Sequence, residues 1–171
     1  MKKILLISDT HSHIDKTILK YVKETDEVWH AGDIGNIEIL DEIKKICKCR
    51  AVFGNIDDNS ARSLLSETKS FYCEKIKICM IHIAGKPPYY NFKTKRLISL
   101  EKPRILIYGH SHILKVNHDK KNNLLCINPG AAGRHGFHKK RTMIRFEIDG
   151  INIKNMEVIE LGNRSILSDS V

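Results

Sequence analysis

The chain has 171 residues, of which 42% are hydrophobic, and its formal net charge at pH 7 is +9. This size fits a single domain with one core. No apolar run reaches the length of a membrane span, and the run at residues 4–7 is too short for a secretory signal, so we expect a cytoplasmic protein without membrane contact. The odd count of five cysteines favours reduced thiols over a disulfide framework.

The positive charge has two interpretations. It is typical of proteins that bind nucleic acid or another polyanion. Most of the lysines are scattered, however, which favours a compositional bias of the chain over a binding surface. Residues 134–141 form the densest basic stretch and are the exception.

Strands and helices are predicted to alternate in the first half of the chain. Residues 3–8, 27–31 and 50–53 are apolar runs typical of buried strands. Residues 15–23 and 37–47 carry apolar side chains at helical spacing. This order predicts βαβ units, hence a parallel sheet with right-handed crossovers.

The second half is predicted to be mostly antiparallel. Its expected strands are residues 71–74, 77–82, 104–108, 114–118, 124–127, 141–148 and 151–159, with one helix at 91–101. Asp149-Gly150 is a strong hairpin signal between the last two strands. We therefore expect an α/β fold in which two mixed sheets stack face to face with helices outside, a four-layer αββα sandwich. Residues 1–164 form the predicted domain, and 165–171 a flexible tail.

Seven polar side chains follow the ends of predicted strands, most of them directly. They are Asp9, His11, Asp33, Asn55, His82, His110 and His112. Strand ends on one edge of a sheet converge, so distant segments can build one site. Oxygen and nitrogen donors without sulfur suit divalent Mn, Fe, Ni or Zn, and two such metals indicate hydrolysis, most often at phosphorus.

Each segment also has a structural interpretation when it is considered alone. Asp33 could cap the following helix, Asn55 could occupy a turn, and His82 could be a structural histidine. Asp57 is more suited to orienting a neighbour than to binding metal. The joint placement of the segments at successive strand ends favours the metal site.

The order Asp-x-His, Gly-Asp, Gly-Asn, His, Gly-His-x-His resembles the calcineurin-like metallophosphoesterase superfamily. The resemblance covers residues 2–160, and Asn128-Pro129-Gly130 is similar to the small YfcE-type phosphodiesterase branch. It implies the metallophosphoesterase fold and a hydroxide between two metals that attacks phosphorus. It also implies a first metal held by Asp9, His11, Asp33 and His112, and a second held by Asp33, Asn55, His82 and His110.

The chain departs from this family at the leaving group. Many larger relatives have a histidine after the amide ligand that can protonate the departing oxygen, whereas this chain has Ile56. His13, His135 and His138 are alternative donors, and each could instead be an exposed loop residue. Arg134 could contact the substrate phosphate.

The predicted function is therefore that of a metal-dependent phosphodiesterase acting on a small phosphodiester. Its expected catalytic residues are Asp33, Asn55 and His82, with His13 and Arg134 as further candidates, and its cofactors are two divalent ions, Mn before Ni, Fe or Zn. A non-catalytic scaffold, as in the retromer subunit of similar fold, a nuclease and a phosphomonoesterase are the alternatives. Residues 85–90 (G-K-P-P-Y-Y) could stack on a nucleoside, cover core or join subunits of a homo-oligomer.

Overall fold

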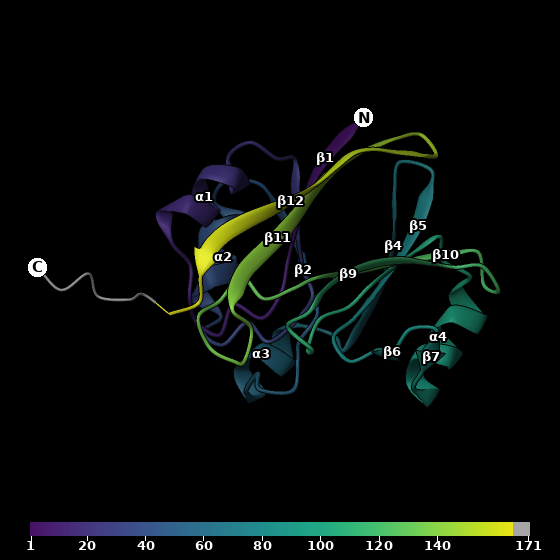
Figure 1. Ribbon diagram of the computed structural model, residues 1–171, viewed down its shortest axis with the longest axis horizontal. Helices are drawn as coiled ribbons and strands as arrows, with labels where there is room; N and C mark the ends of the chain where they lie inside the picture. The colour runs from purple at the N-terminus through teal and green to yellow at the C-terminus, as the bar shows by residue number, and fades with distance from the viewer. Residues whose placement is uncertain (166–171) are drawn as a thin grey trace, which may run out of the picture.

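The computed structural model describes residues 1–165, which form two five-stranded mixed sheets with helices outside them (Figure 1). The first sheet has the order β12-β11-β1-β2-β3. Its strands are β1 (Lys2–Ile7), β2 (Glu27–His30), β3 (Lys48–Ala51), β11 (Lys140–Asp149) and β12 (Asn152–Asn163). β1, β2 and β3 are parallel, as the βαβ pattern predicts, and β11 pairs antiparallel with β1 and β12.

The second sheet has the order β4-β5-β8-β10-β9. Its strands are β4 (Thr68–Cys73), β5 (Ile76–Ile81), β8 (Ile105–Ile107), β9 (Leu114–Asp119) and β10 (Leu124–Pro129). The outer pairs are antiparallel, while β8 is parallel to both β5 and β10. The expectation of a mostly antiparallel second half was therefore wrong for the centre of this sheet. The helix between β5 and β8 brings the chain back to the end of the sheet at which β5 began. A crossover of this kind joins parallel strands.

Four helices complete the layers: α1 (Lys16–Val22), α2 (Glu38–Lys44), α3 (Asn59–Leu64) and α4 (Phe92–Glu101). The side chains of Asp15, Asp58 and Asn91 cap three of them by accepting a hydrogen bond from a backbone N–H in the first turn. The helix predicted at residues 37–47 is present as α2, but it ends at Lys44. Helix α3 was not predicted, because it is one short segment with a single buried side chain, Ala61, and so has no apolar stripe.

Alternating side chains of the central strands divide the core. On β1, Ile4 and Leu6 lie between the sheets, while Leu5 and Ile7 pack with residues of α1 and α2. On β5, Ile78 and Met80 join the core between the sheets, and the intervening Cys79 packs toward α4. Each sheet is thus buried on both faces, and the predicted four-layer αββα sandwich is confirmed.

The tyrosine-rich segment forms a two-stranded ribbon of β6 (Gly85–Lys86) and β7 (Tyr89–Tyr90) around a cis Pro87–Pro88 bond. Tyr90 is buried, and its hydroxyl donates to Asp119 Oδ2 at 2.7 Å, whereas Tyr89 is exposed. One of the two tyrosines therefore covers core, as one of the alternatives for this segment proposed.

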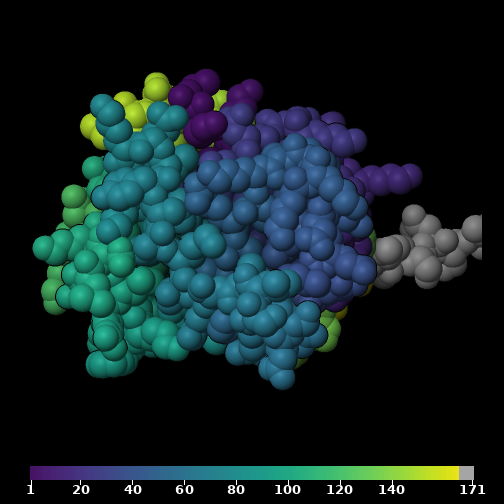
Figure 2. Space-filling model, turned by 180° about the vertical axis from the view of Figure 1, so that it is seen from behind, coloured from purple at the N-terminus to yellow at the C-terminus, as the bar shows by residue number. Residues whose placement is uncertain are grey.

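From behind, blue and teal segments from the first two thirds of the chain form most of the surface, with the last hairpin at the margin (Figure 2). Within residues 1–165, no helix has the length and apolar character needed to cross a membrane. Of the predicted tail, residues 166–171 lie outside the described residues. The boundary of the domain at residue 164 remains a prediction.

Candidate metal centre

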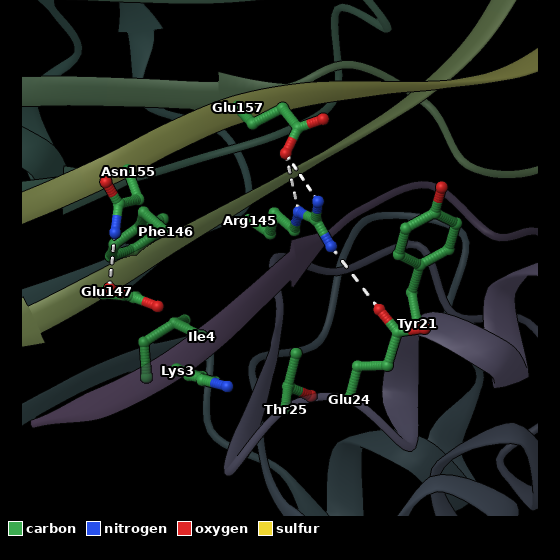
Figure 3. A pocket seen from close by; sticks show the side chains of 10 residues that line it. All are labelled: Lys3, Ile4, Tyr21, Glu24, Thr25, Arg145, Phe146, Glu147, Asn155 and Glu157. Carbon is green, nitrogen blue, oxygen red and sulfur yellow. Dashed lines mark hydrogen bonds and ion pairs between the residues drawn. The ribbon is translucent and has the colours of Figure 1, made fainter.

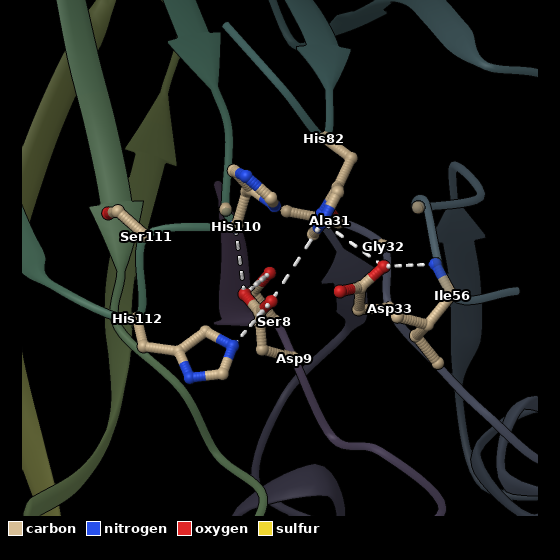
Figure 4. Close-up of polar contacts among 12 residues, drawn as sticks. Ser8, Asp9, Ala31, Gly32, Asp33, Ile56, His82, His110, Ser111 and His112 are labelled. Atoms are coloured by element: carbon tan, nitrogen blue, oxygen red, sulfur yellow. Dashed lines mark hydrogen bonds and ion pairs between the residues drawn. The ribbon is translucent and has the colours of Figure 1, made fainter. Parts of the chain in front are cut away.

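The predicted polar residues converge where the carboxyl ends of strands from both sheets meet, and Figure 4 shows Asp9, Asp33, His82, His110 and His112 among them. β1, β2 and β3 of the first sheet lead to Asp9, Asp33 and Asn55. β5 and β8 of the second sheet lead to His82 and His110. The site thus depends on the stacking of the two sheets, because neither sheet alone supplies the whole set.

A first group of donor atoms comes from Asp9, His11 and His112, all within 4.8 Å of one another. The Nε2 atoms of His11 and His112 face each other at 3.3 Å. His112 Nε2 also lies 3.1 Å from Asp9 Oδ1. Two imidazole nitrogens and a carboxylate oxygen at these separations can reach one cation.

A second group, from Asp33, His82 and His110, lies beside the first. His82 Nε2 is 3.1 Å from Asp33 Oδ1, while Asp33 Oδ2 is 3.8 Å from His11 Nε2. One carboxylate therefore presents one oxygen to each group. This is the geometry that a bridging ligand between two cations requires.

Two buried atoms at the centre test whether metals fit these residues. Asp9 Oδ1 and His82 Nε2 are inaccessible to solvent and lack a hydrogen-bond partner of acceptable geometry within residues 1–165. Asp9 is fully buried and the side chain of His82 is 2% exposed. Buried polar atoms without partners are costly, and a cation at each donor group would satisfy them. The residues therefore fit a divalent metal bound through oxygen and nitrogen.

Hydrogen bonds to the far ring nitrogens of two histidines hold the other nitrogen toward the centre. His82 Nδ1 donates a hydrogen bond to the carbonyl oxygen of Ala31 at 2.7 Å. In the neutral ring, Nε2 then carries the free electron pair that can bind a metal. His112 Nδ1 lies 3.1 Å from His138 Nδ1, and His138 Nε2 donates to the Gly133 carbonyl at 3.0 Å. This relay assigns the proton of His112 to Nδ1 and leaves its Nε2 free as well.

The backbone of the site is mostly left-handed. Five of the seven predicted ligands have positive φ, with values of 53° for Asp9, 45° for His11, 53° for Asp33, 69° for His110 and 56° for His112. Left-handed backbone is uncommon for residues other than glycine, and it concentrates at functional sites. Gly54 and Gly109 pack against the carboxylates of Asp33 and Asp9 so closely that a Cβ atom would collide with them. The site is thus built by tight loops.

Comparison with known proteins identifies the family. The model of the calcineurin-like phosphoesterase superfamily domain matches residues 1–150. The chain belongs to this superfamily. A protein of Methanocaldococcus jannaschii named a probable metallophosphoesterase is 32% identical over 133 residues, which are 74% of this chain and 66% of that protein. The chain thus spans slightly less than two thirds of that relative.

Two solved structures share the phosphoesterase fold. A mutant of Vps29 from Entamoeba histolytica has a TM-score of 0.74 at 18% identity, and the match covers 94% of this chain and 99% of that one. An archaeal protein described as a novel phosphodiesterase has a TM-score of 0.67 at 19% identity, with 93% and 99% covered. The resemblance to this superfamily is therefore confirmed.

Burial and neighbouring charges set the protonation of the phosphoesterase site. Burial lowers the pKa of His11, which favours the neutral, metal-binding imidazole. Burial alone would raise the pKa of Asp33, but its contacts with His82, the hydrogen bond from the Ile56 N–H and the electrostatic effect of His11 together hold the pKa below its ordinary value. The carboxylate is therefore ionised at neutral pH.

The open side of the site is a cavity of about 440 Å³. Its floor includes His11, Asp33, His110 and His112, and Asn55 lies beside them in the lining. The next residue, Ile56, also lines the cavity, and its backbone N–H donates to Asp33 Oδ1 at 3.1 Å. At this position the side chain offers no proton to a leaving group.

Two further predicted residues lie outside this cavity. His13 Nε2 is 3.2 Å from Asp15 Oδ2 and 3.3 Å from Arg134 Nε. Arg134 also donates to the carbonyl of Arg164 at 3.2 Å. Neither residue lines the cavity, whereas His135 and His138 do. The structure therefore places His13 and Arg134 in a separate network behind the site.

Sequence reasoning missed one supporting residue, His30, at the end of β2. It is fully buried, Gly32 N–H donates to its Nδ1 at 3.2 Å, and its Nε2 lies 2.9 Å from Thr10 Oγ1. Burial lowers its pKa to about 4, so the ring is neutral. A polar residue at the end of an apolar strand, three residues before the predicted ligand Asp33, was the available signal.

Asp57 fixes the loops that carry two of the predicted ligands. Its carboxylate accepts from Gly35 N at 2.8 Å and from Gly54 N at 2.7 Å, although the side chain is almost fully buried. The loop after β2 and the loop after β3 are thereby tied together beneath Asp33 and Asn55. Asp57 orients backbone amides and not an imidazole.

Proposed function

We propose that this phosphoesterase is a metal-dependent phosphodiesterase that uses two divalent cations. The observation that carries the proposal is Asp33, whose two carboxylate oxygens face two adjacent donor groups. Bound cations would lower the pKa of a water molecule and neutralise charge that develops on the phosphoryl oxygens.

The proposed ligands follow the two donor groups. Asp9, His11, Asp33 and His112 would hold the first ion, and Asp33, Asn55, His82 and His110 the second. The donor set suits Mn, with Ni, Fe and Zn as alternatives. Histidine tautomers fixed by the Ala31 carbonyl and by His138 keep two of the donor nitrogens directed inward.

The proton for the leaving group is the remaining requirement. His13 lies outside the cavity, and both ring nitrogens of His138 have partners. His135 lines the cavity, is exposed, and makes no side-chain hydrogen bond within residues 1–165. We therefore assign His135 to this role for alkoxide leaving groups, whereas a good leaving group such as a phenolate requires no donor.

Turnover of bis-p-nitrophenyl phosphate tests the proposal. Protein freed of metal and then supplied with Mn, Ni, Fe or Zn should cleave it only in the presence of metal, and Asp33→Ala should not cleave it under any condition. p-Nitrophenyl phosphate, measured in parallel, separates a diesterase from a monoesterase. Absence of turnover with all four metals would remove the enzymatic function.

A non-catalytic scaffold is the second candidate, favoured by Ile56 and by the fold shared with Vps29. A scaffold does not have to catalyse a reaction. Metal binding without turnover would therefore support this second candidate. A nuclease is less suited to the site, because within residues 1–165 no Lys or Arg lines the cavity although the chain has 29 of them. Binding of a nucleic-acid backbone depends on such contacts.

The setting of the proposed activity is a cytoplasmic one, with a small phosphodiester as the partner and no membrane. We also propose that the chain forms a homo-oligomer in which the exposed Tyr89 contacts a second subunit. Sedimentation of the purified chain at several concentrations would decide the oligomeric state.

A further inference from the structure

Three large apolar side chains that line the metal cavity are exposed to solvent. Ile56 is 45% exposed, Ile113 is 64% exposed and Phe137 is completely exposed. All three line the same cavity as His11, Asp33, His110 and His112. We call Ile56, Ile113 and Phe137 the apolar rim. The candidate metal site therefore has exposed apolar side chains in its lining, beside the exposed polar residues His110, Ser111 and His135.

Phe137 has no role in packing. The hydrophobic contribution of a side chain to folding scales with the apolar area that it buries, and this ring buries none. Apolar side chains that gather next to a cavity with convergent polar groups are typical of a ligand site. The exposed ring is thus free to serve recognition.

The loop that carries Phe137 is anchored on both sides of the residue. Gly136, with a φ of 123°, packs against the ring of His112 so closely that a Cβ atom would collide with it. His138 contacts His112 Nδ1 and donates to the Gly133 carbonyl. These contacts hold the backbone at Phe137 beside the first donor group while its side chain faces solvent.

The other two rim residues are coupled to the floor through the chain itself. Ile56 follows Asn55 and donates its N–H to Asp33 Oδ1, and Ile113 follows His112 directly. A group attached to a phosphorus atom at the floor would lie in the same cavity as these side chains. Within residues 1–165, the lining contains no lysine or arginine that would favour a charged substituent.

We propose that the apolar rim selects phosphate esters in which a flat aromatic group is attached to the phosphate, with Phe137 as the stacking surface. An aryl ring and a nucleobase share this chemistry. The inference rests on the proposed function, since it assumes that the phosphate binds at the floor. Phe137 is a specificity residue in this proposal, and no chemical step depends on it.

The test compares pairs of ligands that differ only in the aromatic group. Calorimetric affinities are measured on Mn-loaded protein for phenylphosphonate against methylphosphonate. Thymidine 5′-monophosphate against 2-deoxyribose 5-phosphate forms the second pair. Stacking on one aromatic side chain should favour the aromatic member by about 10-fold. A preference for the aromatic ligand in the first pair alone indicates an aryl phosphate substrate. A preference in both pairs indicates a nucleoside phosphate substrate.

Phe137→Ala should reduce that preference to about 2-fold or less, while Phe137→Trp should keep it. Phe92→Ala is the matched control, because Phe92 is 82% exposed on α4 and does not line the cavity. Equal affinities within the pairs in the wild-type protein, or an unchanged preference in Phe137→Ala, would overturn the inference. Because binding is measured without turnover, failure of the diesterase assay is a separate result that concerns only the proposed function.

Discussion

Two cavities of nearly equal volume show what distinguishes a functional site in this protein. The metal cavity measures about 440 Å³, and a second one of about 450 Å³ lies between α1, β1, β11 and β12 (Figure 3). In the second cavity Arg145 pairs with Glu157 Oε2 at 2.7 Å and with Glu24 Oε2 at 3.4 Å. Asn155 donates to Glu147 at 2.7 Å.

The two cavities differ in whether their polar groups have hydrogen-bond or ion-pair partners and in how deeply these groups are buried, not in volume. The polar groups of the Arg145 cavity pair with one another, and the Arg145 side chain is 40% exposed. In the metal cavity, the Asp9 side chain is fully buried and its Oδ1 lacks a hydrogen-bond partner within residues 1–165. A buried polar atom without a partner in the protein needs a ligand or water, so the metal cavity predicts function, whereas the paired charges of the Arg145 cavity predict surface stability.

Asp33→Asn should have the largest effect. The substitution keeps the size of the side chain and removes the charge that faces both donor groups, so phosphodiesterase activity should fall by about 10³-fold or more. Metal content after gel filtration should fall at both positions. His112→Ala is the comparison, because it should mainly weaken the first position. Wild-type metal content in Asp33→Asn would contradict the bridging role.

His138→Ala should have an intermediate effect. Without the acceptor for its Nδ1 proton, His112 loses its fixed tautomer, and metal affinity should fall by about 10–100-fold. Titration with Mn at limiting concentration measures this affinity, and His138→Asn should restore part of it because an amide can also accept and donate. The exposed His118 on β9 offers a matched control as His118→Ala. Equal losses in both alanine variants would point to a general effect of removing histidine.

The buried His30 should make stability depend on pH. Its pKa is about 4 in the folded protein against 6.5 for an unperturbed imidazole, so between these values the unfolded chain binds a proton that the folded chain does not. The stabilisation from His30 is complete above pH 6.5 and is lost as pH falls toward 4, by about 3 kcal/mol. Urea unfolding from pH 7.5 to 4 measures this slope, and His30→Gln should flatten it. An unchanged slope would show that other groups dominate.

Arg145→Ala should have the smallest effect. Ion pairs of exposed side chains contribute about 0–1 kcal/mol, so the midpoint of urea unfolding should shift only slightly. Cleavage of bis-p-nitrophenyl phosphate should stay within about 2-fold of wild type, because Arg145 lies in the other cavity. A large loss of activity would show that the two cavities are coupled and that their comparison is misleading.

Within residues 1–165, local sequence patterns predicted the strands of the two large sheets, three of the four helices and the residues at the strand ends, but not β6 and β7. Apolar runs such as residues 3–8 need no tertiary information, since burial on both faces requires a continuous apolar strand. The order of the polar segments also identified the superfamily before the fold was known. Helix α3 was not predicted, because a single buried alanine gives no periodic apolar pattern.

Only the tertiary structure decided which polar residues share the cavity. His13 and His138 are equally polar loop residues in the sequence, yet one contacts Asp15 and the other contacts His112. Left-handed backbone at five ligands and the contact of Gly136 with His112 depend on loops packed from both sheets. Local pattern specifies which side chains end a strand, but the direction in which they point is fixed by packing between segments far apart in the chain. For that reason the sequence predicted the donor set, and only the fold revealed its supports and its apolar rim.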